Sequence, residues 1–444
     1  MSEKSKKMSA KARLETLFDD GVYFELEGSA QPGAAVAAYG SVGGATVFAL
    51  CQDSAVDAGA VDAAHARKWN KVYELAAKTG APVVTLYDSV GVRVNEGFSS
   101  LEASSKILRS CSALSGVVPQ IAVVLGTCAG FASMAAAMAD VCVMAKDAQL
   151  FLTSAFADKA AGGATKEVGS AAFAERAGGA SVVCDDEKAA IEKAAQLLRL
   201  LPLNNLDALP RFDAEAPAFS REGSPIETTA DADSVLELSA NTGKHARTAL
   251  VTLGGTPCGM LEANGRLCRK DTAKCAKLVE LCDAFNLPVV CFVNSDGFTV
   301  SAENDELGGI KAAAGLAHVL GEATTAKLSV VTGSAIGAAF TTFCSKNCGA
   351  DMTYALDGAV ISALPCEAAA ALRHEKDIKA DGDIAALGAA YAADEASAAA
   401  ALKAGVIDAV IAPEATRDTL IAAVDMLSTK RVSRLPKKHG NLPL

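Results

Sequence analysis

The stretch VVTLYDSVGVRV at residues 83–94 returns in altered form as VVCFVNSDGFTV at residues 289–300, which lies 206 residues later. A second pair of motifs keeps almost the same spacing, because VLGTCAG at residues 124–130 is followed 207 residues later by VTGSAIG at residues 331–337. Related stretches at a nearly constant offset indicate an internal duplication. The sequence therefore predicts two copies of one fold in a single chain.

The length of the chain and the composition of one segment locate the two copies. The chain has 444 residues, a length that suits two or three domains. The stretch at residues 202–225 is rich in proline and polar residues, which is typical of a linker. We place the boundary near Ser220, which gives predicted domains at residues 1–219 and 220–444.

Strands and helices are predicted to alternate in both copies. In the first copy, a helix at residues 61–78 precedes an apolar strand that ends near Asp88. In the second copy, a strand around residues 258–262 precedes a helix at residues 271–285. This alternation is typical of crossover units built on a mainly parallel sheet. The predicted fold class is therefore α/β.

Two segments near the C-terminus are interpreted from their composition. Residues 366–404 are rich in alanine, a strong helix former, and predict two or three helices. The end of the chain, KRVSRLPKKHGNLPL at residues 430–444, is basic and contains proline. We expect this tail to lie on the surface of a neighbour.

Charge excludes one class of partner. The formal net charge is −11, whereas a protein that binds nucleic acid needs a basic face for the phosphates. We therefore expect no nucleic-acid partner. The N-terminus is charged and has no apolar signal core, and no apolar run is long enough to span a membrane, so we expect a cytoplasmic protein.

The 13 cysteines raise the question of a metal site or disulfides. No Cys-x-x-Cys motif occurs, and the closest pair, Cys344 and Cys348, has no second pair nearby. Most cysteines lie within apolar runs, which indicates buried free thiols in a reducing compartment. We predict no metal site.

Two glycine-rich loops are the candidate sites of chemistry. GTCAGFASM begins at Gly126 and GSAIGAAFT begins at Gly333, and each follows an apolar strand and opens onto small residues. Glycine at the end of a strand lets free backbone N–H groups approach a ligand, as in an oxyanion hole. A turn of this kind can equally be a plain packing device, so the loops alone leave both interpretations open.

Charged side chains near the loops have two interpretations each. None of the five histidines lies in either loop, so the sequence shows no evident general base. We expect Asp88 and its counterpart Asn294 to cap strand ends. Arg93 either binds an anionic substrate or forms a surface ion pair.

These motifs together resemble the carboxyltransferase subunit of biotin-dependent acyl-CoA carboxylases and decarboxylases, in the propionyl-CoA and methylmalonyl-CoA branch of the crotonase superfamily. The resemblance runs nearly from end to end. Its stretches are residues 7–21, 79–97, 115–130, 177–190, 200–205, 286–290, 404–420 and 435–444.

The resemblance implies a fold and a site. Each lobe is expected to be a crotonase-like (ClpP/crotonase) ββα-spiral domain, and the active site is expected between the N-lobe of one subunit and the C-lobe of another. Backbone N–H groups of Gly130 and Phe131 would hold the thioester oxygen of the acyl-CoA, and those of Ala338 and Ala339 the ureido oxygen of biotin. The other implied contacts are Gly91, Arg93, Ala129 and Thr341 for the substrate and Gly333 and Gly337 for the cofactor.

The resemblance also implies partners. Biotin would arrive on a separate biotin carboxyl carrier protein, because the chain has no Met-Lys-Met biotinylation segment. Further partners would be a biotin carboxylase or membrane decarboxylase subunits, and the chain would form a homo-oligomer between a dimer and a hexamer. The substrate would be a short acyl-CoA, whose identity and the direction of the reaction stay open.

Several positions depart from the family pattern. Phe131 stands where a second glycine is usual, and Ile336 and Ala338 replace a tyrosine and a glycine. A backbone donor survives such a change only where φ stays negative. The alternative to a carboxyltransferase is therefore a structural or CoA-binding subunit that has lost turnover. A hydratase or thioesterase would need acidic residues in the first loop, which has none.

Overall fold

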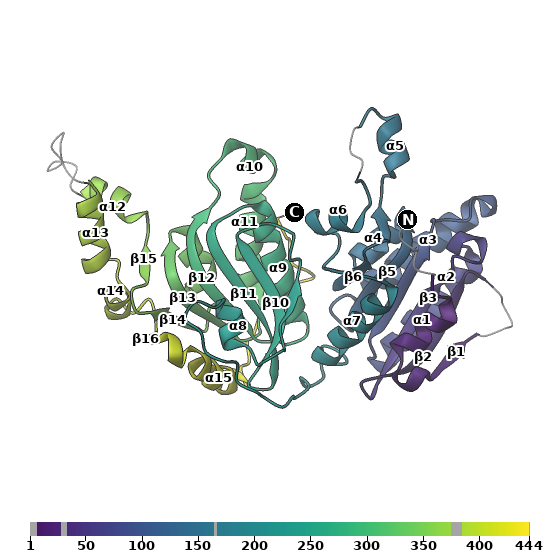
Figure 1. The fold of residues 1–444 in the computed structure, drawn as a ribbon, viewed down its shortest axis with the longest axis horizontal. Coiled ribbons are helices and arrows are strands. Elements are labelled where there is room, and N and C mark those ends of the chain that lie inside the picture. The colour runs from purple at the N-terminus through teal and green to yellow at the C-terminus, as the bar shows by residue number, and fades with distance from the viewer. Residues whose placement is uncertain (1–6, 28–32, 164–166, 374–383, 444) are drawn as a thin grey trace. The chain divides into compact units, whose positions relative to one another are not determined.

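The computed structural model describes residues 7–27, 33–163, 167–373 and 384–443 (Figure 1). The chain divides into two compact units. Unit 1 comprises Met1–Pro210 and Ser239–Thr242, and unit 2 comprises Arg211–Leu238 and Gly243–Leu444. The short segment Ser239–Thr242 belongs to unit 1 because the Ser239 N–H donates to the carbonyl of Ser181 at 2.6 Å.

Unit 1 contains one sheet and its covering helices. In chain order its elements are α1 (Ala10–Leu17), β1 (Tyr23–Leu26), β2 (Ala35–Val42), β3 (Ala45–Gln52), α2 (Ala63–Thr79), β4 (Val83–Ser89), α3 (Phe98–Leu114), β5 (Gln120–Ala129), α4 (Phe131–Ala137), β6 (Val141–Ala145), β7 (Gln149–Phe151), α5 (Ala155–Ala160), α6 (Ala171–Arg176), β8 (Val182–Cys184) and α7 (Glu187–Leu200). The strand order is β1-β2-β3-β4-β5-β6-β8, and β7 pairs with β5. β1, β2 and β3 pair antiparallel, and all other pairs are parallel.

Unit 2 repeats this arrangement. Its elements are α8 (Pro225–Thr229), β9 (Leu236–Leu238), β10 (Ala246–Leu253), β11 (Thr256–Leu267), α9 (Arg269–Ala284), β12 (Val289–Phe298), α10 (Ala302–Glu306), α11 (Gly309–Glu322), β13 (Lys327–Ile336), β14 (Met352–Leu356), β15 (Val360–Ser362), α12 (Cys366–Arg373), α13 (Ile384–Asp394), α14 (Ala398–Lys403), β16 (Ala409–Ile411) and α15 (Thr416–Leu427). Its strand order is β9-β10-β11-β12-β13-β14-β16 with β15 on β13, so each strand of unit 1 has a counterpart. The predicted duplication and the α/β class are confirmed.

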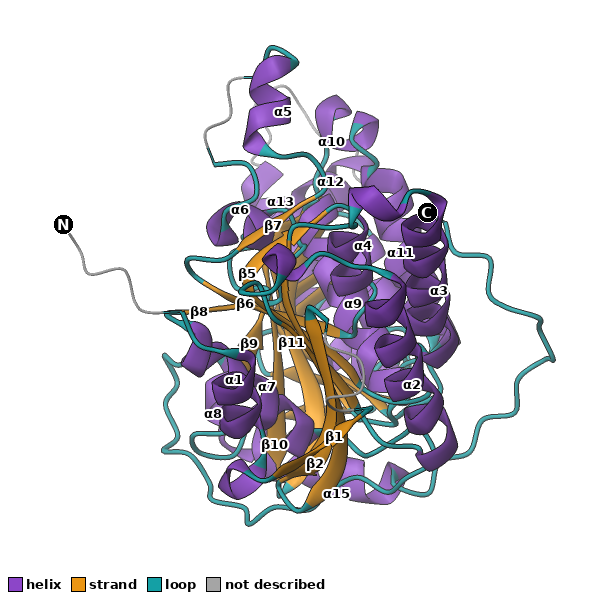
Figure 2. Cartoon of the chain, turned by 90° about the vertical axis from the view of Figure 1, so that its right-hand side faces the viewer, coloured by secondary structure: helices purple, strands orange, loops and turns teal. Residues whose placement is uncertain are grey.

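Helices cover the buried strands (Figure 2). In unit 1, α2 packs with α3 and against β2 and β3, whereas α1 packs with α7, which lies against β5 and β6. In unit 2, α9 packs with α11 and against β10 and β11, while α8 packs with α15. Parallel strands covered on both faces are buried along their whole length, and all seven residues of β4 are buried, including the polar residues at its C-terminal end.

Helix α2 shows how local sequence signals place an element. Asp62 precedes it and accepts the N–H of His65 at 2.7 Å, and Gly80 ends it with φ of 67°. Trp69, the single tryptophan of the chain, is 1% exposed and stacks between His65 and Tyr73. The predicted helix at residues 61–78 is confirmed as Ala63–Thr79.

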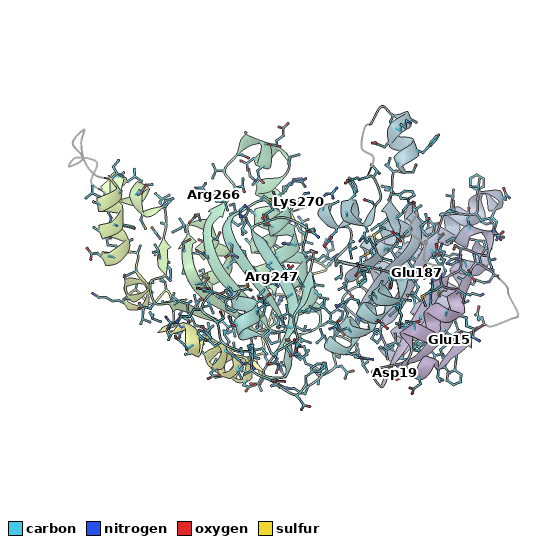
Figure 3. All side chains as sticks on the ribbon, in the orientation of Figure 1. Glu15, Asp19, Glu187, Arg247, Arg266 and Lys270 are labelled. Carbon is cyan, nitrogen blue, oxygen red and sulfur yellow. The ribbon has the colours of Figure 1, made fainter. Side chains whose placement is uncertain are left out.

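The segment before β10 explains where unit 2 begins. Phe212 N–H donates to the carbonyl of Gly255 at 2.9 Å, so the chain already lies on the β10–β11 hairpin there. Arg247 of β10 pairs with Glu227 and Glu237 at 2.9 Å each (Figure 3). The compact unit therefore starts at Arg211, whereas linker composition had placed the boundary at Ser220.

The two segments interpreted from composition have different outcomes. The Ala-rich stretch contains α12, α13 and α14, in agreement with the prediction, and its residues 374–383 lie outside the described part of the chain. The expectation that the basic tail lies on a neighbour stays a prediction. Within its own chain the tail contacts unit 2, because Lys430 Nζ lies 2.7 Å from Asp351 Oδ2 and Arg434 Nη2 lies 3.6 Å from Asp283 Oδ2.

Over the part of the chain that the structure describes, no helix combines the length and the apolar character needed to cross a bilayer.

Candidate active site

The same irregularity interrupts the parallel sheet in both units. Between β4 and β5, Tyr87 pairs with Val124, but the next paired residues are Ser89 and Cys128. Three residues of β5 therefore lie opposite one residue of β4, which is Asp88. The pairing of β12 with β13 breaks in the same way opposite Asn294. Such a bulge bends a strand and re-aims the residues after it.

Glycine is required at the centre of each bulge. A Cβ atom on Gly126 would lie 2.0 Å from Asp88 Oδ1, and one on Gly333 would lie 2.3 Å from Asn294 Oδ1. The carboxyl or amide group therefore fills the space that a side chain at the glycine would need. The structure places Gly333 against Asn294, and shows no further role for it.

The two polar residues at the bulges differ in their bonding. Asn294 Oδ1 accepts the N–H of Ser334 at 2.9 Å, so it caps the bulge as expected for a strand-end residue. Asp88 does not cap. Its carboxylate accepts from Arg13 at 2.9 Å and from Ser54 at 2.8 Å, and the expectation of capping at Asp88 is corrected.

A tight turn follows each bulge. Gly130 has φ of 61° and Gly337 has φ of 54°, values that favour glycine. Gly130 N–H donates to the carbonyl of Phe151 at 3.1 Å, and Gly337 N–H donates to that of Ser362 at 2.8 Å. These two N–H groups are therefore engaged in pairing with β7 and β15. Gly130 and Gly337 form the turns, and Gly130 has no free N–H to offer a thioester oxygen.

The backbone donors that remain lie just after the two glycines. Among the described residues, none accepts a hydrogen bond from the N–H of Phe131 or Ala132 in unit 1. The same is true of the N–H groups of Ala338 and Ala339 in unit 2, where Ala338 is exposed. Neither Phe131 nor Ala338 has a positive φ, so each adopts its turn without strain. Each unit thus has two adjacent unpaired donors, of which the first residue is at least partly exposed and the second, Ala132 or Ala339, is buried.

A second loop lies beside each turn. In unit 1, Gly91 has φ of 114°, and a Cβ there would lie 3.7 Å from the carbonyl of Ala129. In unit 2, Gly297 has φ of 101°, and a Cβ there would lie 3.7 Å from the carbonyl of Ile336. The structure therefore brings together Gly91 and Ala129, which are far apart in sequence.

Arg93 and Thr341 have partners within the chain. Arg93 pairs with Asp57 and lies 3.4 Å from Asp62, so of its two interpretations the ion pair is the one observed. Thr341 Oγ1 donates to the carbonyl of Gly337 at 3.2 Å. Thr341 lies in a short π-helical turn, Phe340–Cys344, a form often found at functional sites.

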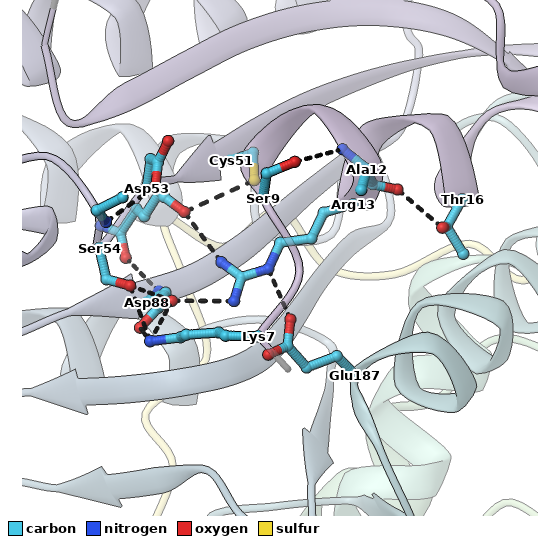
Figure 4. A network of polar contacts seen from close by, with 12 residues as sticks. Lys7, Ser9, Ala12, Arg13, Thr16, Cys51, Asp53, Ser54, Asp88 and Glu187 are labelled. Atoms are coloured by element: carbon cyan, nitrogen blue, oxygen red, sulfur yellow. Dashed lines mark hydrogen bonds and ion pairs between the residues drawn. The ribbon is translucent and has the colours of Figure 1, made fainter. Parts of the chain in front are cut away.

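A buried ionic cluster lies behind the first bulge, and it was not predicted (Figure 4). Arg13 of α1 and Asp88 of β4 are each 1% exposed and bond at 2.9 Å. Arg13 Nε also donates to Glu187 at 2.9 Å, and Lys7 Nζ lies 2.8 Å from Asp88. Burial lowers the pKa of Arg13, but the hydrogen bond to Glu187 and the charges of Glu187 and Asp88 outweigh it, so the pKa is raised.

Three buried titratable groups of unit 1 are uncharged near neutral pH. Burial lowers the pKa of His65 to about 4, against the opposing charge of Asp62. Burial raises the pKa of Cys51 to about 12, and it raises that of Cys128 at the end of β5 well above its ordinary value. Neither thiol is therefore a thiolate near neutral pH.

The arrangement as a whole suits the stabilisation of negative charge on a carbonyl oxygen of a bound ligand. Each unit has two adjacent N–H donors after a glycine turn, and Cys128, two residues before Gly130, is a buried thiol. Such donors stabilise a carbonyl oxygen on which negative charge develops.

Comparison with known proteins agrees with this geometry. The carboxyl transferase domain model matches residues 4–442. Methylmalonyl-CoA decarboxylase subunit alpha of Veillonella parvula is 33% identical over 480 residues, which cover 99% of this chain and 93% of that protein. The propionyl-CoA carboxylase carboxyltransferase subunit of Haloferax mediterranei is 31% identical over 485 residues, which cover 99% of this chain and 94% of that protein.

Solved structures extend the comparison to the fold. The transcarboxylase 12S structure, described as a hexamer assembly with methylmalonyl-coenzyme A and methylmalonic acid bound, superimposes with a TM-score of 0.93 at 30% identity and covers 99% of this chain and 93% of that one. Both units of this chain accordingly have the crotonase-like fold. The chain belongs to the carboxyl transferase domain family.

Proposed function

We propose that the chain is the carboxyltransferase component of a biotin-dependent acyl-CoA carboxylase or decarboxylase. It would move a carboxyl group between carboxybiotin on a separate carrier protein and a short acyl-CoA, such as propionyl-CoA or acetyl-CoA. The observation that carries the proposal is the pair of equivalent glycine turns, each followed by two unpaired N–H groups. Two such turns suit a reaction in which two oxygen atoms gain negative charge.

The first turn is assigned to the acyl-CoA. The N–H groups of Phe131 and Ala132 would hold the thioester oxygen as the α-carbon loses or gains its carboxyl group. Each donor is worth about 3 kcal/mol of barrier on the usual mutational scale. Gly130 shapes the turn, and Gly91 and Ala129 line its other side.

The second turn is assigned to biotin. The N–H groups of Ala338 and Ala339 are unpaired in the described structure and fit a ureido oxygen. When bound, biotin supplies the carboxyl group and the proton-accepting atom, which agrees with loops that contain no histidine. Gly337 shapes this turn, and Thr341 holds its carbonyl in place.

Partners follow from the proposed reaction. The carrier would be a biotin carboxyl carrier protein, recharged by a biotin carboxylase or coupled to membrane decarboxylase subunits. We further propose a cytoplasmic homo-oligomer between a dimer and a hexamer, which the hexameric transcarboxylase relative supports.

A decarboxylation assay tests the function. Purified protein is mixed with free biotin and with malonyl-CoA or methylmalonyl-CoA, and loss of the carboxyl group is followed. Turnover that depends on biotin is the expected result. Binding of the CoA esters without turnover of either would instead identify a structural or CoA-binding subunit, the alternative suggested by Phe131 and Ala338 at positions where glycine is usual in the family.

Two substitutions at one position test the assigned donor. Phe131 is the first residue of α4, where proline is tolerated, so Phe131→Pro removes the N–H with little effect on the helix. We expect kcat to fall by about 10²-fold to 10³-fold. Phe131→Ala keeps the N–H and serves as the matched control, with kcat within about threefold of the wild type. Equal activity of the two variants would refute the assignment.

A further inference from the structure

The turn that follows the first bulge is held from behind by a buried charge. Asp88 lies opposite the three unpaired residues of β5, and its carboxyl group occupies the space beside Gly126. Gly130 and Phe131 follow a few residues later, at the end of the same strand. The Asp88 carboxyl group is therefore packed against β5 just before the turn.

The Asp88 carboxylate is itself held from outside the sheet. Arg13 reaches it from α1 at 2.9 Å, and Ser54 and Lys7 each donate to it at 2.8 Å (Figure 4). Arg13 is bound in turn by Glu187 of α7. Elements far apart in sequence therefore meet at one carboxylate beneath the bulge.

The backbone of Asp88 also contacts Gln52 and the segment that contains Gly59. The backbone N–H of Asp88 donates to Gln52 Oε1 at 2.9 Å, and a Cβ on Gly59 would lie 2.0 Å from the Asp88 carbonyl. Gly59 and Gly91 belong to segments that pair directly, because Val61 N–H donates to the Gly91 carbonyl at 2.8 Å. Asp88 thus contacts the segment that pairs with the Gly91 loop, and that loop lies beside the first turn.

Unit 2 shows that the bulge forms without a buried charge at the position equivalent to Asp88. Its counterpart Asn294 is exposed and uncharged, accepts hydrogen bonds from Ser334, and still supports the same bulge. A buried ion pair is a poor source of stability, since removing two charges from water offsets most of their attraction. The charge at Asp88 therefore calls for an explanation other than the bulge itself.

We propose that Arg13 and Asp88 are positioning residues for the acyl-CoA turn of unit 1. Their buried pair locks the β5 bulge, so that the N–H groups of Phe131 and Ala132 stay aimed at the thioester oxygen. This inference rests on the proposed carboxyltransferase function. An error of about 1 Å in such a donor costs on the order of 10²-fold in rate, which is far more than it changes substrate binding.

The main variant is Asp88→Asn, compared with Asp231→Asn. Asparagine fits the equivalent position in unit 2, so Asp88→Asn is expected to fold. Asp231 forms a comparable buried pair with Arg417 at 2.6 Å, but it binds the Gly254–Gly255 turn at the start of β11, the opposite end of that sheet from the Gly337 turn. Both variants lose a buried charge, but only Asp88 lies behind the turn that is assigned to the acyl-CoA.

Kinetics separate positioning from stability. With biotin and malonyl-CoA or methylmalonyl-CoA, Asp88→Asn should lower kcat by about tenfold to 10²-fold, with KM for the CoA ester changed less than about threefold. Asp231→Asn should lower the melting temperature without changing kcat at about 25 °C. Unchanged kcat in Asp88→Asn, or an equal loss in both variants, would overturn the inference.

A second readout does not need turnover. Amide hydrogen exchange of peptides from residues 125–133 should speed up about tenfold in Asp88→Asn and stay unchanged in Asp231→Asn. If the wild type lacks turnover, the proposed function fails, and exchange at residues 125–133 still decides whether Asp88 holds the turn. Should Asp88→Asn not fold, Arg13→Lys keeps a positive charge at position 13 but loses the guanidinium bonds to Asp88 and Glu187. Faster exchange at residues 125–133 in Arg13→Lys supports the inference, and wild-type exchange overturns it.

Discussion

At two equivalent positions the chain carries a carboxylate and an amide, and this single difference changes how each bulge is held. Asp88 is buried and bound by Arg13, whereas Asn294 is exposed and bonds to the bulge directly. The alignment of the two copies predicts that the positions correspond. It does not reveal Arg13, because the partner lies 75 residues away in sequence and on another element.

His65 gives a prediction at the scale of one residue. Its pKa falls from 6.5 to about 4 on folding because it is buried, so between these values the unfolded chain binds a proton that the folded chain does not. The free energy of unfolding of unit 1 should therefore fall as the pH drops from 6.5 towards 4. At about pH 5 the His65 contribution is a loss of about 2 kcal/mol.

Urea titrations at about pH 7 and about pH 5 measure this effect. Trp69 is the only tryptophan and stacks on His65, so its fluorescence reports on unit 1. His65→Phe preserves the stacking and should remove the component of about 2 kcal/mol. A variant with the same difference between the two pH values as the wild type would contradict the assignment of His65 as a buried neutral base.

At the scale of elements, each turn is the product of a strand, a bulge and the next strand. The glycines at positions 130 and 337 are visible in the sequence as turn residues, and φ near +60° confirms that interpretation. The motif could not show that β7 and β15 take up their N–H groups. We therefore propose Phe131 and Ala132 as the donor pair in unit 1, in place of the predicted pair Gly130 and Phe131.

The two bulges should respond differently to the same substitution. Gly126→Ala pushes on Asp88, which is locked by Arg13, so the unfolding free energy should fall by about 3 kcal/mol or more. Gly333→Ala pushes on the exposed Asn294, which can rotate away at the cost of about one hydrogen bond, or about 1 kcal/mol.

Thermal unfolding of both variants provides the comparison. Gly321→Ala is the matched control, because no atom lies within 4 Å of the added methyl group, and alanine favours the helix by about 1 kcal/mol. Equal destabilisation by Gly126→Ala and Gly333→Ala would show that Asp88 is no more rigid than Asn294.

At the scale of the molecule, two units of one topology form from a single chain, and each has its own sheet and core. The two units are not fully separate along the chain. The segment Ser239–Thr242 belongs to unit 1, although it follows the first segment of unit 2. Composition located the linker correctly as a region of proline and polar residues. It could not locate the boundary to the residue, because Phe212 joins unit 2 through one backbone hydrogen bond.

The C-terminal tail yields a prediction for the whole chain. Deleting residues 430–444 removes the half-buried pair of Lys430 with Asp351 and the pair of Arg434 with Asp283. We expect unit 2 to lose about 1–3 kcal/mol of stability, since Asp351 would stay partly buried after losing one of its donors. Unit 1, reported by Trp69 fluorescence, should be unaffected.

Calorimetry of the truncated chain measures the change, and Lys438→Ala is a control because this exposed lysine forms no ion pair with any described residue. An unchanged transition for unit 2 would mean that the tail contributes no stability where the structure places it.

The sequence by itself determined the duplication, the α/β class, the approximate limits of α2 and α9 and the two glycine turns. Each of these depends on local signals, such as the period of apolar residues, a helix cap or the need for positive φ. The tertiary structure alone decided which N–H groups stay free, which charge Asp88 meets and where the tail lies. Those features depend on contacts between residues far apart in the chain, and neither periodicity nor propensity carries that information.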